Sequence, residues 1–246
     1  MIDHEFTVGD SPSIKVGVRS GRVRVEPGQP GMVRILVDTR DPTFEVVQRG
    51  DAISASGERG GRAEVTVHVP PAANIEVSTA SADVEVVARV GRLEVASASG
   101  DLRFDTATRL QVKSASGAIW GNRVDGEARC ITASGDIQIT QVADRADLST
   151  ASGDVVIDKS TGTLSIATLS GEIRVHRHTG PDLSVKSMSG GVRIGIPPRT
   201  RLELDATTLS GKVILPTSQP SSDPPEREMS VKVRLVSGDL RVVRAD

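Results

Sequence analysis

The stretch Thr150-Ala151-Ser152-Gly153-Asp154-Val155-Val156-Ile157 decides the fold, because near-copies of it recur from residue 75 to residue 243. Each copy centres on a Ser-Gly or Ser-Ala dipeptide, and successive copies lie 18, 17, 18, 18, 18, 19, 21 and 27 residues apart. A period of this length is typical of solenoid proteins, in which each repeat forms one rung of a stack. The nine corner dipeptides are Ser81-Ala82, Ser99-Gly100, Ser116-Gly117, Ser134-Gly135, Ser152-Gly153, Ser170-Gly171, Ser189-Gly190, Ser210-Gly211 and Ser237-Gly238.

Apolar residues recur at fixed distances from the second residue of each corner. The positions seven before it, five before it and two after it are apolar in every repeat. A spacing of two is the strand period, so each rung is predicted to contain two short strands with alternate side chains pointing inward. The sequence therefore predicts an all-β, parallel β-solenoid with right-handed winding and consecutive rungs about 4.8 Å apart. The three columns are Ile75, Leu93, Leu110, Ala128, Ala146, Leu164, Leu183, Leu204 and Val231; Val77, Val95, Val112, Cys130, Leu148, Ile166, Val185, Ala206 and Val233; and Val84, Leu102, Ile119, Ile137, Val155, Ile173, Val192, Val213 and Leu240.

The two ends of the chain depart from this regular pattern. Residues 1–71 are predicted to form an N-terminal β region of degenerate rungs that caps the stack, because Ser20-Gly21 and Ser56-Gly57 resemble corners. Residues 72–246 are predicted to form the regular Ser-Gly-repeat solenoid. The Pro- and Ser-rich segment 216–228 predicts an excursion from the stack, followed by a closing strand over residues 230–235.

Composition and charge exclude several classes of protein. The chain has 30 basic and 32 acidic side chains, which is not the electrostatic footprint of a general nucleic-acid binder. No apolar run approaches the roughly 20 residues of a membrane span, so direct membrane insertion is not expected. The N-terminal residues show no signal-peptide pattern and Cys130 is the single cysteine, so we expect a cytoplasmic location.

The corners have a chemistry of their own. Glycine allows a close backbone approach or a positive φ, and serine can bond to its own turn, which together explain the Ser-Gly pair. A second hydroxyl recurs three residues before most corner glycines, and we expect these hydroxyls to hydrogen-bond up and down their column. Acids often follow the corner and could line one edge as Ca²⁺ ligands, although solvated turn acids are the favoured interpretation. The hydroxyls are Thr79, Ser97, Ser114, Thr132, Thr150, Thr168 and Ser187, and the acids are Asp83, Asp101, Asp136, Asp154, Glu172 and Asp239.

The chain resembles a known family, the bacterial putative-adhesin or toastrack β-strand-repeat proteins. The resemblance rests on the strand Phe6-Thr7-Val8, the hinge Val69-Pro70-Pro71 and the rungs typified by Leu93 to Leu102, and it covers essentially the whole chain. It implies a β-solenoid fold and an accessory role in membrane-stress signalling. It implies no catalytic residue.

The candidate chemical groups have simpler structural explanations. His176 and His178 could form half of a metal site with His68 or His4, but exposed corner histidines are expected because ligand spacing is missing. Cys130 lies in an inward column, where burial raises the pKa of a thiol. The repeated serines belong to the corners. We therefore predict no enzyme activity, no catalytic residue, no metal site and no cofactor.

Trp120 is the most informative residue outside the predicted core. It stands at an outward position, where Arg103 of the preceding rung is predicted to stack on the indole. A lone tryptophan is also a common interface anchor. We therefore predict a partner-binding face, which consists of Trp120, Arg103, Arg174, Arg193 and Arg241.

The leading functional hypothesis is a non-catalytic scaffold or protein-interaction module, with an unidentified protein partner or self-association. One alternative is a carbohydrate-binding or carbohydrate-active β-helix, which would need aromatic platforms or convergent carboxylates. One tryptophan and no tyrosine make a poor sugar surface. A second alternative is a self-assembling, filament-type solenoid.

Overall fold

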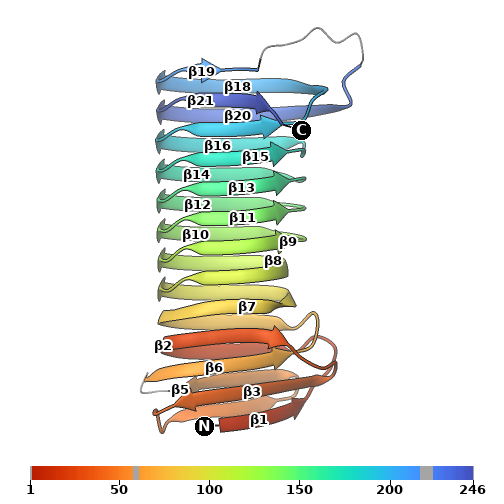
Figure 1. Cartoon of the computed structure of the whole chain (residues 1–246), viewed down its shortest axis with the longest axis vertical. Coiled ribbons are helices and arrows are strands. Elements are labelled where there is room, and N and C mark those ends of the chain that lie inside the picture. Colours follow the sequence, from red (N-terminus) through yellow and green to blue (C-terminus); the bar gives the residue numbers. More distant parts are fainter. Residues whose placement is uncertain (1, 58–60, 217–223, 246) are drawn as a thin grey trace. The chain divides into compact units, whose positions relative to one another are not determined.

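The computed structural model describes residues 2–57, 61–216 and 224–245, which form strands and no helix (Figure 1). The chain divides into two compact units, Met1–Asp125 and Gly126–Asp246. Parallel strand pairs stack rung upon rung in each unit, so the predicted parallel β-solenoid is confirmed. Right-handed winding stays a prediction. None of the described segments is a helix long and apolar enough to cross a membrane.

The regular part of the second unit has two strands per rung. One strand ends at the corner serine, and the other begins two residues after the corner glycine. Equivalent residues pair in register, as Leu164 does with Leu183 and Ile173 with Val192, which is the register predicted from the columns. The strands are β10 (Ala128–Ser134), β11 (Ile137–Val142), β12 (Ala146–Ser152), β13 (Val155–Ser160), β14 (Leu164–Ser170), β15 (Ile173–His178), β16 (Asp182–Ser189) and β17 (Val192–Ile196).

The last two rungs stack in the reverse of their sequence order. Strand β20 (Arg227–Ser237) pairs with β16 on one side and with β18 (Thr200–Ser210) on the other. Likewise β21 (Leu240–Arg244) lies between β17 and β19 (Val213–Ile214). The expectation that consecutive rungs are neighbours is therefore wrong at this end.

Hydrophobic burial explains the reversal. Strand β20 of the inserted rung carries Val233 and Leu235 where β18 carries Ala206 and Thr208, and β19 is only two residues long. The more apolar rung therefore occupies the covered position. Strand β20 also begins at Arg227, inside the segment predicted as an excursion, and residues 217–223 of that segment lie outside the described residues.

In the first unit, β2 (Ser13–Pro27) is a rung. It pairs in parallel with β7 (Asn74–Ser99), with Ser20 and Gly21 opposite Ser81 and Ala82. Its other side pairs with β5 (Ala52–Gly57) and β6 (Arg62–Val69), where Gly21 lies opposite Ala63. The prediction of a corner at Ser56-Gly57 is therefore wrong, because Ala63 occupies the corner register. Strands β8 (Leu102–Ser116) and β9 (Ile119–Val124) continue the rungs.

Antiparallel strands close the first rung of this unit. Strand β3 (Met32–Thr39) pairs antiparallel with β6, and β1 (Ile2–Thr7) pairs antiparallel with β3. Strand β4 (Phe44–Arg49) pairs antiparallel with β5. These strands change direction relative to the stack, and they cover the edges of β5 and β6 that would otherwise be free.

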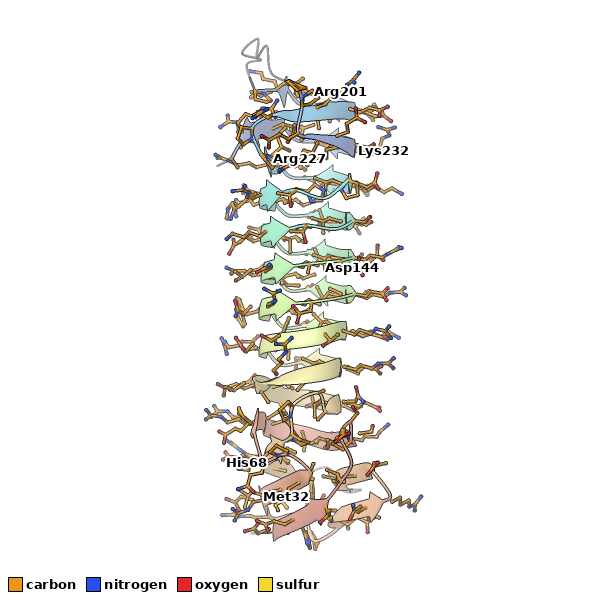
Figure 2. All side chains as sticks on the ribbon, turned by 90° about the vertical axis from the view of Figure 1, so that its right-hand side faces the viewer. Met32, His68, Asp144, Arg201, Arg227 and Lys232 are labelled. Atoms are coloured by element: carbon orange, nitrogen blue, oxygen red, sulfur yellow. The ribbon has the colours of Figure 1, made fainter. Side chains whose placement is uncertain are left out.

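The three predicted columns are buried in every rung except β18–β19. A fourth inward column lies four residues after the corner and includes Phe104, Ile157 and Val175, each at most 5% exposed. Glycine replaces an apolar residue in this column at Gly121, because the Phe104 ring fills the space that a Cβ there would need. Figure 2 shows the long polar side chains, among them Arg201 and Lys232, pointing away from the strands.

The hydroxyl column does not form the predicted ladder. Thr150 donates to the carbonyl oxygen of Gly135 at 3.3 Å. Thr79 accepts a hydrogen bond from the Ala82 amide. These bonds go to backbone atoms of the corner and not to other hydroxyls. Within the described residues, no hydrogen-bond partner is found for the buried hydroxyls of Ser97, Ser114, Thr132 and Thr168.

Corner glycines stack with a very close backbone approach. A methyl group at Gly190 would lie 2.1 Å from the carbonyl oxygen of Gly171, and Gly190 has a φ of 125°. The next residue, Gly191, has no such conflict, because the nearest atom to a methyl group there is 3.8 Å away.

This contrast predicts opposite outcomes for two adjacent alanine substitutions. Gly190→Ala should lower the free energy of unfolding by at least about 2 kcal/mol, because it forces both a positive φ and a backbone clash. Gly191→Ala should change it by less than about 0.5 kcal/mol. Denaturant unfolding of both variants checks this, and equal losses would contradict the stacking argument.

Candidate functional site

Trp120 and Arg103 meet as predicted in the first unit. They lie opposite each other on β9 and β8, with the Arg103 Cζ 4.3 Å from the indole centroid. Arg103 is exposed, and Trp120 is only half-buried. The cation–π contact contributes about 0.5 to 1 kcal/mol of favourable interaction energy at such a site. The guanidinium covers one face of the ring.

The three other predicted face residues form a column in the second unit. Arg174 lies opposite Arg193, and Arg193 lies opposite Arg241. Arg174 forms ion pairs with Glu172 and Asp154. Arg193 and Arg241 are exposed and form no ion pair within the described ranges. The structure thus groups the predicted residues into a Trp–Arg pair in one unit and an arginine column in the other.

The corner acids have a structural role that the sequence did not reveal. The Oδ1 atom of Asp154 accepts the backbone N–H of Glu172 at 2.8 Å, and Asp136 does the same for Asp154 at 2.9 Å. In the last rungs, Asp239 accepts the N–H of Lys212 at 2.8 Å. Each carboxylate therefore satisfies a backbone donor of the neighbouring rung, so these acids are more than solvated turn residues.

No group of three or more His, Cys, Asp or Glu side chains suited to a metal ion occurs within residues 2–57, 61–216 and 224–245. The acid column offers one carboxylate oxygen per rung to a backbone amide. The geometry of the column is that of a hydrogen-bond ladder.

The two neighbouring histidines lie on opposite sides of the chain. His176 is exposed, with its Nδ1 2.8 Å from Asp158 Oδ1. His178 is fully buried, in register with the buried Ser160, and its ring nitrogens have no hydrogen-bond partner among the residues that the structure describes. The expectation that both are exposed is therefore wrong for His178, because the alternation of inward residues shifts between Val175 and His178 while the chain is still in β15.

Burial lowers the pKa of His178 to about 4, and Asp182 opposes this effect only in part. The unfolded chain, with a pKa near 6.5, therefore binds a proton over a pH range in which the folded chain does not. The resulting stabilisation is complete above pH 6.5 and is lost as the pH falls toward 4.

We expect His178→Leu to remove this pH dependence of the free energy of unfolding. The wild-type free energy of unfolding should fall by about 3 kcal/mol between pH 6.5 and 4 from this group alone. Unfolding at a series of pH values measures the slope. Ser160→Ala is the matched control, since it alters the same column without removing a titrating group and should keep the wild-type slope. Identical slopes for wild type and His178→Leu would contradict the assignment.

Cys130 is an inert core residue. It is 0% exposed, and burial raises the pKa of its thiol to about 12. A nucleophilic or metal-ligating cysteine needs an accessible thiolate, which this environment disfavours.

The structure reveals an exposed apolar ridge that the sequence reading missed. Two residues before the corner glycine, four successive rungs of the second unit carry large apolar side chains that are 45 to 79% exposed. Their flanking residues pair from rung to rung, so the four side chains stand in one line. In stacking order the apolar ridge consists of Leu169, Met188, Val236 and Leu209.

The position of residues relative to each corner glycine could have revealed this ridge from the sequence. The equivalent position holds Ala133 and Ala151 in the two preceding rungs of this unit, and it changes to larger residues only from Leu169 onward. Contiguous exposed apolar side chains of this kind mark interaction sites. Arg193 flanks the ridge on one face of the rungs, and Lys186 flanks it on the other.

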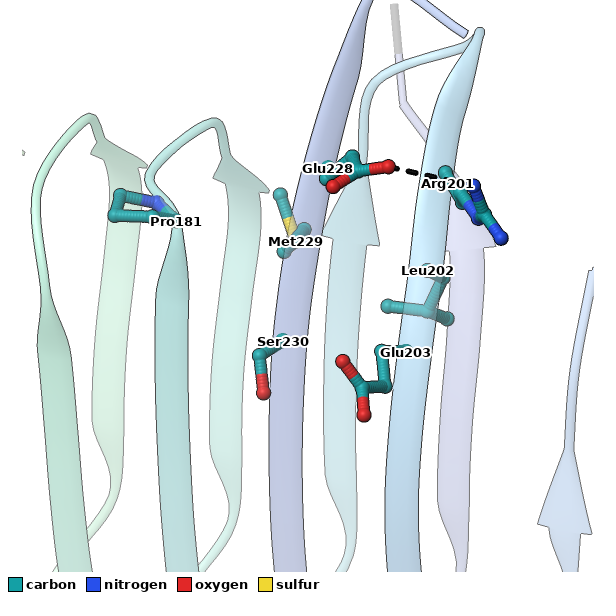
Figure 3. A pocket seen from close by; sticks show the side chains of 7 residues that line it. All are labelled: Pro181, Arg201, Leu202, Glu203, Glu228, Met229 and Ser230. Carbon is teal, nitrogen blue, oxygen red and sulfur yellow. Dashed lines mark hydrogen bonds and ion pairs between the residues drawn. The ribbon is translucent and has the colours of Figure 1, made fainter.

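A hollow of about 650 Å³ lies near the beginning of β18 and β20 (Figure 3). Glu228 reaches toward Arg201 across it, and the two form an ion pair at 3.4 Å. Leu202 and Met229 supply apolar surface, and Glu203 lies opposite Ser230 in the strand register. The lining residues are Pro181, Arg201, Leu202, Glu203, Glu228, Met229 and Ser230.

The chain is a β-solenoid, and the stacking of its rungs explains the residues that recur from repeat to repeat. A family model, Toastrack DUF4097, matches residues 37–243, and the chain belongs to this family. No curated protein matches the sequence.

Solved structures similar to this chain include proteins described as putative adhesins. One from Parabacteroides distasonis is 16% identical with a TM-score of 0.54, and the match covers 98% of this chain and 96% of that one. Another from Bacteroides fragilis is 11% identical with a TM-score of 0.46, over 98% and 96% of the two chains. The first of these supports the fold, and its low identity carries no residue role to this chain.

Proposed function

We propose that this protein is a non-catalytic interaction module that binds a protein partner through the apolar ridge. The coarse assignment, a non-enzymatic adhesin-like domain, agrees with the family and with the solved structures. The observation that carries the finer proposal is the line of Leu169, Met188, Val236 and Leu209, which remains in water although the three inner rungs of this line bury their inward apolar side chains. The family resemblance extends the proposal to an accessory role in membrane-stress signalling.

The surroundings of the ridge support a partner with acidic groups. Arg193 and Arg241 are exposed and without ion pairs in the described part of the chain, whereas Arg174 in the same column is paired. Lys186 stands on the opposite flank, also exposed. An apolar centre with charged flanks is the usual anatomy of a protein interface, with the apolar core supplying affinity and the rim supplying selectivity.

The carbohydrate alternative lacks an accessible aromatic platform. The single tryptophan already has Arg103 stacked on its ring. The described carboxylates at the corners accept backbone hydrogen bonds and point along the stack in one column, so they do not converge in a groove.

Ridge substitutions should abolish partner capture without unfolding the protein. We expect Leu169→Ser/Met188→Ser to reduce recovery of the main partner by at least about tenfold in quantitative cross-linking from native cells. The matched control Ala133→Ser/Ala151→Ser changes the same column two rungs away and should keep full recovery. Equal recovery from both double variants would refute the ridge as the docking surface.

Trp120→Ala tests the separate face predicted from the sequence. We expect weaker partner recovery, because the substitution removes the indole and releases Arg103 from its stacked position. Arg109→Ser, at an exposed position without an ion pair among the described residues, is a control on the same strand as Arg103. If Trp120→Ala leaves both pull-down partners and self-association unchanged, that face does not dock a partner.

A further inference from the structure

The terminal rung β18–β19 exposes its inward side chains. Val213 is 42% exposed and Leu215 is 51% exposed, whereas Leu240 and Val242, at the equivalent positions of the covering rung, are 1% exposed. On β18, Leu204 is half-buried although its partner Val231 is fully buried. This rung therefore leaves one cross-section of the apolar interior in contact with solvent.

The same rung also has free backbone edges. Within the described residues, β18 pairs only with β20, and β19 pairs only with β21. The outer N–H and C=O groups of β18 therefore form an unpaired edge over up to 11 residues. Such an edge is a template for strand pairing unless it is covered or carries unbalanced charge.

Local charge offers little protection to this edge. Residues 200–215 carry two basic and two acidic side chains, so two copies of the rung would meet without net repulsion. Asp205 pairs with Arg234, and Arg201 pairs with Glu228, so two of these charges are already engaged with β20. By contrast, antiparallel strands close the first rung of the first unit.

We propose that the β18–β19 edge binds the same edge of a second copy of this chain, which gives a closed two-fold dimer. A suitable occupant must offer unpaired strand edges of matching length together with apolar columns at strand spacing, and the chain itself carries both. Its β20–β21 rung pairs in parallel with the inner side of β18–β19, and about a two-fold axis the outer side of β18 would pair antiparallel with its copy. Because the same edge meets itself about a two-fold axis, the contact is isologous and closes at two copies instead of propagating into a filament.

The tests of this dimer and of the apolar ridge are separable. The ridge reaches the edge strand β18 at Leu209, but the ridge test changes Leu169 and Met188, which lie on inner rungs. A failure of one proposal can therefore be distinguished from a failure of the other.

Sedimentation equilibrium over a wide concentration range tests the proposal. The full chain should reach twice the monomer mass and no more, and Val213→Lys/Leu215→Lys should raise the dissociation constant by at least about tenfold. The matched control Val87→Lys/Ile131→Lys places the same charges at exposed positions on β7 and β10, outside both the edge and the apolar ridge, and should leave the constant unchanged. A monomer at every concentration, or larger polymers, would overturn the proposal.

Spin labels locate the contact within any dimer that forms. A label on Lys212→Cys should give a short distance between copies, because Lys212 lies in the terminal rung; the buried Cys130 should stay unlabelled. A label on Gln138→Cys lies five rung steps, or about 24 Å, from the edge, so its distance between copies should be longer by roughly 50 Å. A shorter distance for Gln138 than for Lys212 would also overturn the proposal.

Discussion

The close stacking of corner backbones is the constraint on which the rest of this structure depends. Where one rung turns, the carbonyl oxygen of the neighbouring corner occupies the space that a Cβ would need, as Gly171 does for Gly190. The corner amide of one rung then donates to the serine carbonyl of the next, for example Gly153 to Ser170 at 3.1 Å. This contact sets the register, and the register aligns the apolar columns.

That constraint divides the residues between structure and function. Corner glycines, corner acids and inward columns are all engaged by neighbouring rungs, and the buried His178 and Cys130 belong to the same interior. Interaction chemistry is left to outward positions, which the neighbouring rungs do not bury. The apolar ridge and the arginine column both lie at such positions, and so does Trp120 with its stacked Arg103.

The spacing of residues from each corner predicted part of the candidate site and missed the rest. It placed Arg103 on Trp120 and aligned Arg174, Arg193 and Arg241, because parallel register makes sequence spacing equal to spatial adjacency. It did not predict the apolar ridge. The ridge position is alanine in some rungs and Leu, Met or Val in others, so it forms no repeated pattern. The spacing also misplaced His178, because the strand alternation shifts between Val175 and His178 within β15.

The sequence by itself determined the repeat, the strand pairs and the inward columns, because each depends on local spacing and on residues that repeat. Only the tertiary structure decided which rungs are neighbours at the ends. The insertion of β20–β21 between earlier rungs, the pairing of β2 with β7, and the antiparallel cap follow from competition among similar rungs for covered positions. The order of the rungs depends on how much apolar side-chain surface each rung buries in a given position. The repeat pattern of the sequence does not contain this quantity.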